Sequence, residues 1–232
     1  MKSTHILAVI SLGAAASAAQ AEVSSTVIIG SDYDFRGISQ TARKPSLQIG
    51  VDWSLASGAY LSAVAGNVDA GADAKSKVEV DIYGGYRGSL SDDLSYELSF
   101  AQYTFHPRGD DVDYTELSAG LAFKAISATY SYAWDYSNSG LAASYVEVNG
   151  SVPLPKDFGL ELHSGYSFGE YWRGSEYFDY AIGVSKQVGD VVMNLSWVDG
   201  SDLKSARVTM DDVFTSESKV VFSVSMTLPL KH

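Results

Sequence analysis

The chain has 232 residues, a formal net charge of -12 at pH 7 and no cysteine. An acidic chain argues against a nucleic-acid partner, and the lack of cysteine excludes disulfides, thiolate metal sites and cysteine nucleophiles. Aromatic residues make up 12% of the sequence, which is a high share for a chain with only 19% charged residues. Membrane barrels use such aromatics at their two interfaces with water.

The first 21 residues have the pattern of a secretory signal peptide. Lys2 supplies the charged start, an apolar core begins at Ile6, and Ala19-Gln20-Ala21 forms an A-x-A cleavage site. The apolar run is shorter than the ~20 residues of a membrane-spanning helix. We therefore predict export with cleavage after Ala21, which leaves a mature chain of residues 22–232.

Beyond the signal, apolar and polar residues alternate in one segment after another, as in Val78-Glu79-Val80-Asp81-Ile82. Successive side chains of a strand point to opposite faces, so each segment would have one apolar and one polar face. The pattern predicts strands at 23–36, 44–55, 58–69, 77–88, 93–105, 113–123, 126–136, 143–154, 158–169, 176–187, 190–200 and 218–229. Short turns alternate with longer polar loops, the longest at 201–217. We therefore predict an all-β, transmembrane, antiparallel up-and-down β-barrel of about 12 strands, with both termini at the short-turn, periplasmic end.

One parity of these strands carries no charge, as a lipid-facing surface requires, because a Lys or Arg at mid-depth costs ~2–4 kcal/mol. This outward set runs from Val27, Ile29, Tyr33 and Phe35 through Ile126, Tyr130, Tyr132, Trp134 and Tyr136 to Phe222, Val224, Met226 and Leu228. The small residues of the strand at 58–69 leave its inward face undecided. A soluble two-sheet sandwich would show the same alternation, but the inward parity is too polar for a dry core.

The inward parity collects ten acidic residues and few basic ones. The acidic residues are Asp32, Asp34, Asp52, Glu79, Asp81, Glu97, Glu116, Glu147, Glu161 and Asp179, and the basic residues are Arg36, Arg87 and His163. We interpret both groups as pore-lining. In a water-filled lumen fixed carboxylates attract cations, which predicts a porin-like channel for passive diffusion of small polar, cationic solutes.

An alternative is a lumen closed by its own side chains. The carboxylates would then pair with Arg36, Arg87, Lys124, Lys219 and tyrosine hydroxyls, because small barrels are often filled in this way. Such a plugged barrel would serve as a structural or interaction protein, with its long loops as the binding surface.

A barrel hydrolase is a weaker alternative, because it needs a nucleophile beside a base. His163 precedes Ser164, but adjacent strand residues face opposite sides, and His106 lies in a loop with no forced partner. We therefore predict no catalytic residue, cofactor or metal. The expected partners are outer-membrane lipid, the barrel-insertion machinery and small solutes, for a monomer in the outer membrane of a Gram-negative bacterium.

Five stretches, in order along the chain, resemble the TorF-family porins of proteobacteria. They are Asp34-Phe35-Arg36-Gly37-Ile38-Ser39-Gln40, Glu79-Val80-Asp81-Ile82-Tyr83-Gly84-Gly85-Tyr86, Tyr114-Thr115-Glu116-Leu117-Ser118-Ala119-Gly120-Leu121, His163-Ser164-Gly165-Tyr166-Ser167-Phe168 and Val221-Phe222-Ser223-Val224-Ser225. The resemblance runs over nearly the whole mature chain. It implies an outer-membrane barrel that acts as a porin, without a defined substrate.

Overall fold

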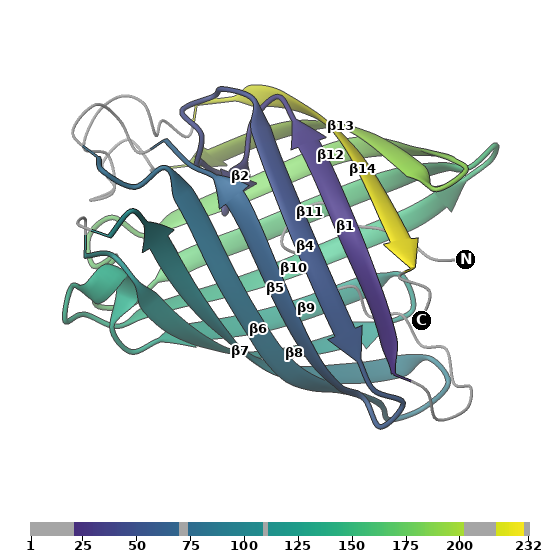
Figure 1. Cartoon of the computed structure of the whole chain (residues 1–232), viewed down its shortest axis with the longest axis horizontal. Coiled ribbons are helices and arrows are strands. Elements are labelled where there is room, and N and C mark those ends of the chain that lie inside the picture. Colours follow the sequence, from purple (N-terminus) through teal and green to yellow (C-terminus); the bar gives the residue numbers. More distant parts are fainter. Residues whose placement is uncertain (1–20, 70–73, 109–110, 202–216, 230–232) are drawn as a thin grey trace.

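The computed structural model describes residues 21–69, 74–108, 111–201 and 217–229, and in these ranges it forms a closed antiparallel barrel of 12 strands (Figure 1). The barrel strands are β1 (Glu22–Gly30), β4 (Ser46–Ser54), β5 (Ala59–Asn67), β6 (Val78–Ser89), β7 (Leu94–His106), β8 (Tyr114–Phe123), β9 (Ile126–Ala133), β10 (Ala143–Leu154), β11 (Phe158–Phe168), β12 (Tyr177–Val188), β13 (Val191–Ser201) and β14 (Lys219–Pro229). Each strand pairs with its neighbours in sequence order, and β1 closes the barrel against β14. The predicted fold class and strand number are confirmed.

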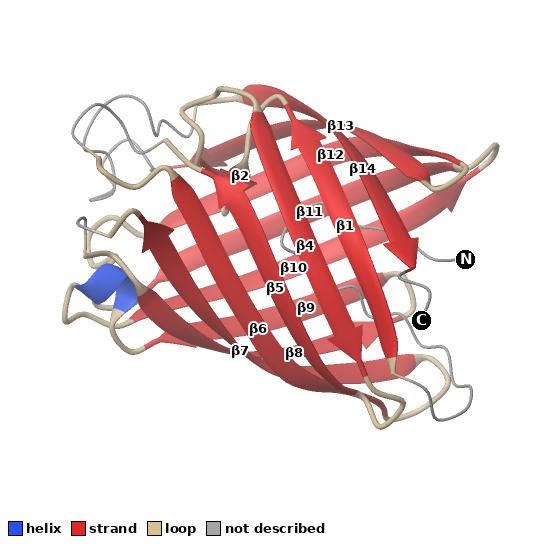
Figure 2. Ribbon diagram, viewed as in Figure 1, coloured by secondary structure: helices blue, strands red, loops and turns tan. Residues whose placement is uncertain are grey.

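The connections follow the predicted alternation of short turns and long loops. Both the start of β1 and the end of β14 lie at the short-turn end, because Glu22 pairs with Ser54 and Ser24 with Pro229. Figure 2 shows a wall of strands, with the helical turn η1 (Tyr136–Asn138) in blue among the long loops. The predicted signal peptide, apart from Ala21, and most of the loop at 201–217 lie outside the described residues.

Within the described ranges, no helix has the length and apolar character needed to cross a membrane.

The outer surface of the barrel is built from large apolar side chains. Ile29, Leu117 and Phe222 are examples from three strands, and each exposes close to half of its surface. The strand that the sequence left undecided is now assigned, because Leu61 is exposed on the outer face whereas Ser62 is buried inside. The alternation therefore produces an apolar exterior, as lipid contact requires.

The first strand is shorter than predicted, because it ends at Gly30 rather than at residue 36. Residues 31–45, called the inner segment below, turn into the barrel and form a small hairpin of β2 (Asp34–Phe35) and β3 (Ile38–Ser39) (Figure 1). The turn of this hairpin places Arg36 at φ 53 and Gly37 at φ 78, in the left-handed region that glycine favours.

The prediction that Tyr33 and Phe35 face lipid is therefore wrong. Phe35 packs inside, with its ring centroid 5.9 Å from that of Tyr103 on β7. The alternation of polar and apolar residues continues past Gly30, but it belongs to a separate hairpin rather than to the first barrel strand.

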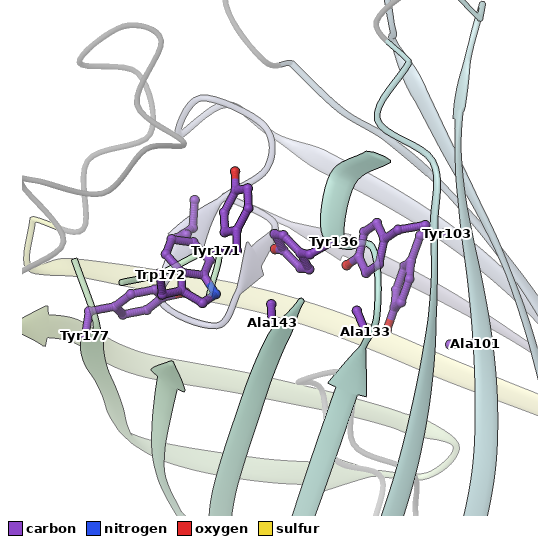
Figure 3. Packing of buried hydrophobic residues seen from close by; sticks show 10 residues of the cluster. Ala101, Tyr103, Ala133, Tyr136, Ala143, Tyr171, Trp172 and Tyr177 are labelled. Carbon is purple, nitrogen blue, oxygen red and sulfur yellow. The ribbon is translucent and has the colours of Figure 1, made fainter. Parts of the chain in front are cut away.

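The prediction that Tyr136 faces lipid is wrong for a similar reason. Strand β9 ends at Ala133, and Tyr136 opens the turn η1, where its side chain is buried. It belongs to a cluster of buried side chains at the long-loop end, the aromatic cluster (Figure 3): Ile38, Ala101, Tyr103, Tyr114, Ala133, Tyr136, Ala143, Tyr171, Trp172 and Tyr177.

The rings of the aromatic cluster contact one another in sequence along the wall. The centroid of Tyr114 lies 4.5 Å from that of Tyr103 and 4.7 Å from that of Tyr136. Tyr136 in turn lies 4.8 Å from Tyr171. Such contacts add to the apolar area that each ring buries. The long-loop end thus contains a packed core as well as polar groups.

Candidate functional site

The candidate site is the barrel interior, where strand parity brings together the predicted acidic residues. Asp52 lies on β4, Glu79 and Asp81 on β6, Glu97 on β7, Glu116 on β8, Glu147 on β10, Glu161 on β11 and Asp179 on β12. Asp32 and Asp34 belong to the inner segment. Five of the strand carboxylates, those of Glu79, Asp81, Glu97, Glu116 and Asp179, are buried.

The inner segment reaches the far wall through Arg36. Its guanidinium donates two hydrogen bonds to the carboxylate of Glu116 on β8, at 2.7 and 2.9 Å. It also lies 4.1 Å from the ring centroid of Tyr145 on β10. In the barrel order, β8 is five strands from β1 in one direction and seven in the other. The inner segment therefore crosses the interior from one wall to the opposite one.

A second anchor holds the near end of the inner segment. Lys219, the first residue of β14, places its Nζ 3.1 Å from Asp32 Oδ2 and 2.6 Å from Asp34 Oδ2. The hydroxyls of Ser39 and Thr41 donate hydrogen bonds to Asp32 Oδ1, at 2.5 and 2.8 Å. The side chains of Lys219, Asp32 and Asp34 are only 7%, 5% and 6% exposed. A buried ion pair is a geometrically demanding contact, so it defines the path of the segment.

Burial and neighbouring charges shift the pKa values of two residues of the inner segment, Asp34 and Arg36. Burial raises the pKa of Asp34 above its ordinary value, and the nearby ammonium of Lys219 offsets part of this effect. Burial alone would lower the pKa of Arg36, but the Glu116 carboxylate outweighs it and holds this pKa well above its ordinary value. Arg36 is thus a permanent cation inside the barrel.

His163 forms the centre of a third group of contacts, on the β10–β12 wall. Its Nε2 lies 2.6 Å from Asp179 Oδ1, and its Nδ1 lies 2.7 Å from Asn149 Oδ1 and 3.7 Å from Glu147 Oε2. Both ring nitrogens face oxygen acceptors, an arrangement that suits a doubly protonated, cationic ring. Tyr145 also donates a hydrogen bond to Asp179, at 3.0 Å.

The geometry around His163 bears on the hydrolase alternative. Ser164 lies on the exposed outer face, so it is on the other side of the wall from the imidazole. The next residue, Gly165, is a glycine for steric reasons, because a Cβ there would collide with the hydroxyl of Tyr145. His106 contacts Thr104 Oγ1 at 3.2 Å. Among the described residues, His163 therefore pairs with interior carboxylates and does not lie where it could activate Ser164.

The short-turn end has its own ion pair. Arg87 Nε donates to Glu97 Oε1 at 3.1 Å, and its guanidinium lies 3.9 Å from the ring centroid of Tyr60. Lys124, expected as a further partner of the interior carboxylates, instead pairs with Asp93 at an exposed turn, at 3.6 Å. That expectation is wrong, because Lys124 occupies the tip of the β8–β9 turn.

Two interior acids are hydrogen-bonded to serines of the neighbouring strand. Asp52 accepts a hydrogen bond from Ser62, and Glu161 accepts one from Ser185 at 3.0 Å. No group of three or more His, Cys, Asp or Glu residues that could hold a metal ion occurs in the part of the chain that the structure describes.

Sequence reasoning identified these acids but missed the central role of Lys219, which it named only as one of several possible partners. The signal was present, since Lys219 has the inward parity of β14. Its pairing with Asp32 and Asp34 depended on the inward turn of the inner segment, which no local pattern shows.

Comparison with solved structures places the barrel among porins in fold. The KdgM porin has a TM-score of 0.54 at 10% identity, covering 91% of this chain and 99% of that chain. The NanC porin has a TM-score of 0.58 at 10% identity, covering 89% and 100%. A structure of the KdgM porin in complex with disordered oligogalacturonate has a TM-score of 0.53 at 10% identity, covering 91% and 99%. At these identities the likeness concerns the fold alone.

In sequence, no curated protein matches the chain. The profile of one family does match, over residues 14–228, and this family is described as "Bacterial protein of unknown function (Gcw_chp)".

Proposed function

The chain belongs to the Gcw_chp family of bacterial proteins of unknown function, and we propose that it is a porin-like outer-membrane channel for passive diffusion of small polar, cationic solutes. The observation that carries this proposal is a closed barrel with an apolar exterior and an acidic interior. The porin folds of the similar structures and the TorF-family resemblance of the sequence support the same class of protein.

The proposed setting follows from the same features. The exposed apolar side chains would contact outer-membrane lipid, residues 1–21 would direct export, and the barrel-insertion machinery would insert the mature chain as a monomer. No catalytic residue, cofactor or metal is needed for passive diffusion, so the functional residues of this proposal are the charged side chains of the interior.

In this proposal the negative charge of the barrel interior favours cations over anions. The ten interior acids face three basic side chains, Arg36, Arg87 and Lys219, with His163 as a fourth partner. Such a surplus of carboxylates attracts cations over the ~8 Å range that physiological salt allows. A polyanion such as the oligogalacturonate in the KdgM complex would be repelled here, so we propose a different solute class for this chain.

The inner segment would act as the constriction. It crosses the interior between the Lys219 and Arg36 anchors, and the aromatic cluster occupies the neighbouring long-loop end. Solutes would pass beside this segment, which favours small ions over oligosaccharides.

Single-channel recording of refolded residues 22–232 in a planar bilayer, under a salt gradient, tests the proposal. We expect conductance steps with a cation-selective reversal potential. Asp52→Asn should lower the cation preference, whereas Asp93→Asn, at an exposed turn, serves as the matched control. An anion-selective potential would overturn the charge argument, and a folded, inserted but silent barrel would overturn the channel.

The plugged interaction barrel is the second candidate, favoured by the same inner segment and aromatic cluster. If the inner segment and the aromatic cluster close the barrel interior completely, the long loops would become the functional surface. The silent outcome of the recording experiment would support this second function.

A further inference from the structure

Arg36 meets its carboxylate partner in a different way from Arg87. Arg87 and Glu97 are register partners on the neighbouring strands β6 and β7, so their contact is part of the barrel wall. Arg36 lies instead in the turn of the inner-segment hairpin, and its partner Glu116 belongs to β8. One side of the Arg36–Glu116 contact is therefore fixed in the wall, whereas the other side is carried by a separate hairpin.

The wall side of this contact has the features of a guanidinium site. The two oxygens of Glu116 accept one hydrogen bond each from the two terminal nitrogens of Arg36, at 2.7 and 2.9 Å. Such paired hydrogen bonds match the planar fork of a guanidinium but not the compact ammonium of a lysine. The ring of Tyr145 adds a cation–π contact, with its centroid 4.1 Å from the guanidinium carbon. These wall groups thus converge on one planar cation that the chain itself supplies.

The backbone at Arg36 indicates that this position holds an arginine because of its side chain. Its φ of 53 lies in the left-handed region, which favours glycine and in which an arginine is uncommon. The turn has its own support, because the backbone N–H of Gly37 donates a hydrogen bond to Asp34 Oδ1 at 3.0 Å. A glycine at position 36 would therefore suit the same turn and leave the site on the wall empty.

We propose that Glu116 and Tyr145 form a recognition site for guanidinium compounds, which Arg36 occupies as a tethered ligand and for which a free solute of the arginine type competes. This inference rests on the proposed function, because it names the class of cation that the channel would select. The side chain of Arg36 keeps 13% of its surface exposed, so the site borders solvent. A group on a short tether acts at an effective concentration in the millimolar range, so solute at millimolar concentration competes with it.

Binding can be measured by isothermal titration of the refolded mature chain in detergent, with L-arginine and L-lysine as probes of equal charge. Arg36→Gly removes the tethered ligand and suits the positive φ. We expect this variant to bind L-arginine more than about tenfold more tightly than L-lysine, because one hydrogen bond to a charged group is worth about a factor of ten in affinity. The wild type should bind L-arginine about tenfold more weakly than Arg36→Gly does, because Arg36 competes for the site.

Further variants locate the binding. Combining Arg36→Gly with Glu116→Gln removes the carboxylate and keeps the side-chain shape, so the affinity for L-arginine should fall more than about tenfold. Arg173→Gly, in an exposed loop, is the matched control and should bind as the wild type does. If Arg36→Gly does not fold, Arg36→Lys takes its place, because an ammonium lacks the fork and competes less well. Heat-modifiable mobility on electrophoresis identifies folded barrels in every sample.

Two results would overturn the site. Equal affinity for L-arginine and L-lysine in the folded Arg36 variant, or no binding of either, would show that the wall does not recognise a guanidinium. Wild-type affinity for L-arginine equal to that of the variant would show that Arg36 does not compete for the site. Binding does not require conduction, so a chain that binds L-arginine as expected but is silent in the bilayer would retain the site and refute the channel alone.

Discussion

Replacing Arg36 by methionine tests the anchoring of the inner segment. The change removes the guanidinium and keeps an unbranched apolar stem. The side chains of Arg36 and Glu116 are only 13% and 4% exposed, so their ion pair is buried. Removing one partner of a buried pair costs ~3–5 kcal/mol, because it leaves the other charge unpaired. Loss of the contact with Tyr145 acts in the same direction.

A double-mutant cycle separates the pair from other effects of the change. In Arg36→Met combined with Glu116→Gln no buried charge remains unpaired, so the combined cost should be smaller than the sum of the single costs. We expect a coupling free energy of ~1–3 kcal/mol, within the range of contacting residues.

Unfolding in guanidinium, followed by tryptophan fluorescence in lipid vesicles, measures these free energies. Arg173→Met is the matched control, because Arg173 is 77% exposed and its contact with Glu170 lies on the surface. Surface changes of this kind stay within ~0.5 kcal/mol. The reasoning is refuted if Arg36→Met is as stable as this control, or if the two single costs simply add in the double variant.

Three further changes probe the other structural features. Lys219→Met leaves the two aspartates of the inner segment without their cation, so we expect a loss of ~3–5 kcal/mol in the same unfolding assay, and an unchanged midpoint would count against this anchor. Trp172→Ala removes a buried ring 5.0 Å from that of Tyr177, and we expect ~3–5 kcal/mol from the aromatic cluster, again by guanidinium unfolding. Leu117→Lys at mid-strand should cost ~2–4 kcal/mol in vesicles but Phe123→Lys at the strand end only ~0–1 kcal/mol, and equal costs would argue against lipid contact.

The sequence by itself determined the barrel wall. A period-two pattern is a local property, because it depends only on the alternation of side chains along an extended chain. It therefore predicted 12 strands, the apolar outer face at residues such as Leu117, and the inward direction of Glu79, Asp81 and Glu116, all of which agree with the structure. The inward face of the strand at 58–69 was undecided, because its small residues show little alternation between polar and large apolar side chains.

The tertiary structure alone decided how the interior is filled. Tyr33 and Phe35 continue the alternation of the first strand, so no local signal separates a longer strand from a hairpin that turns inward at Gly30. The turn is stabilised by contacts between distant positions, such as Arg36 with Glu116, 80 residues away, and the two inner-segment aspartates with Lys219. Burial and ion pairing across a closed barrel are properties of the whole assembly of strands. Only the assembled barrel therefore shows that the inner segment crosses the acidic interior and that the aromatic cluster partly fills it.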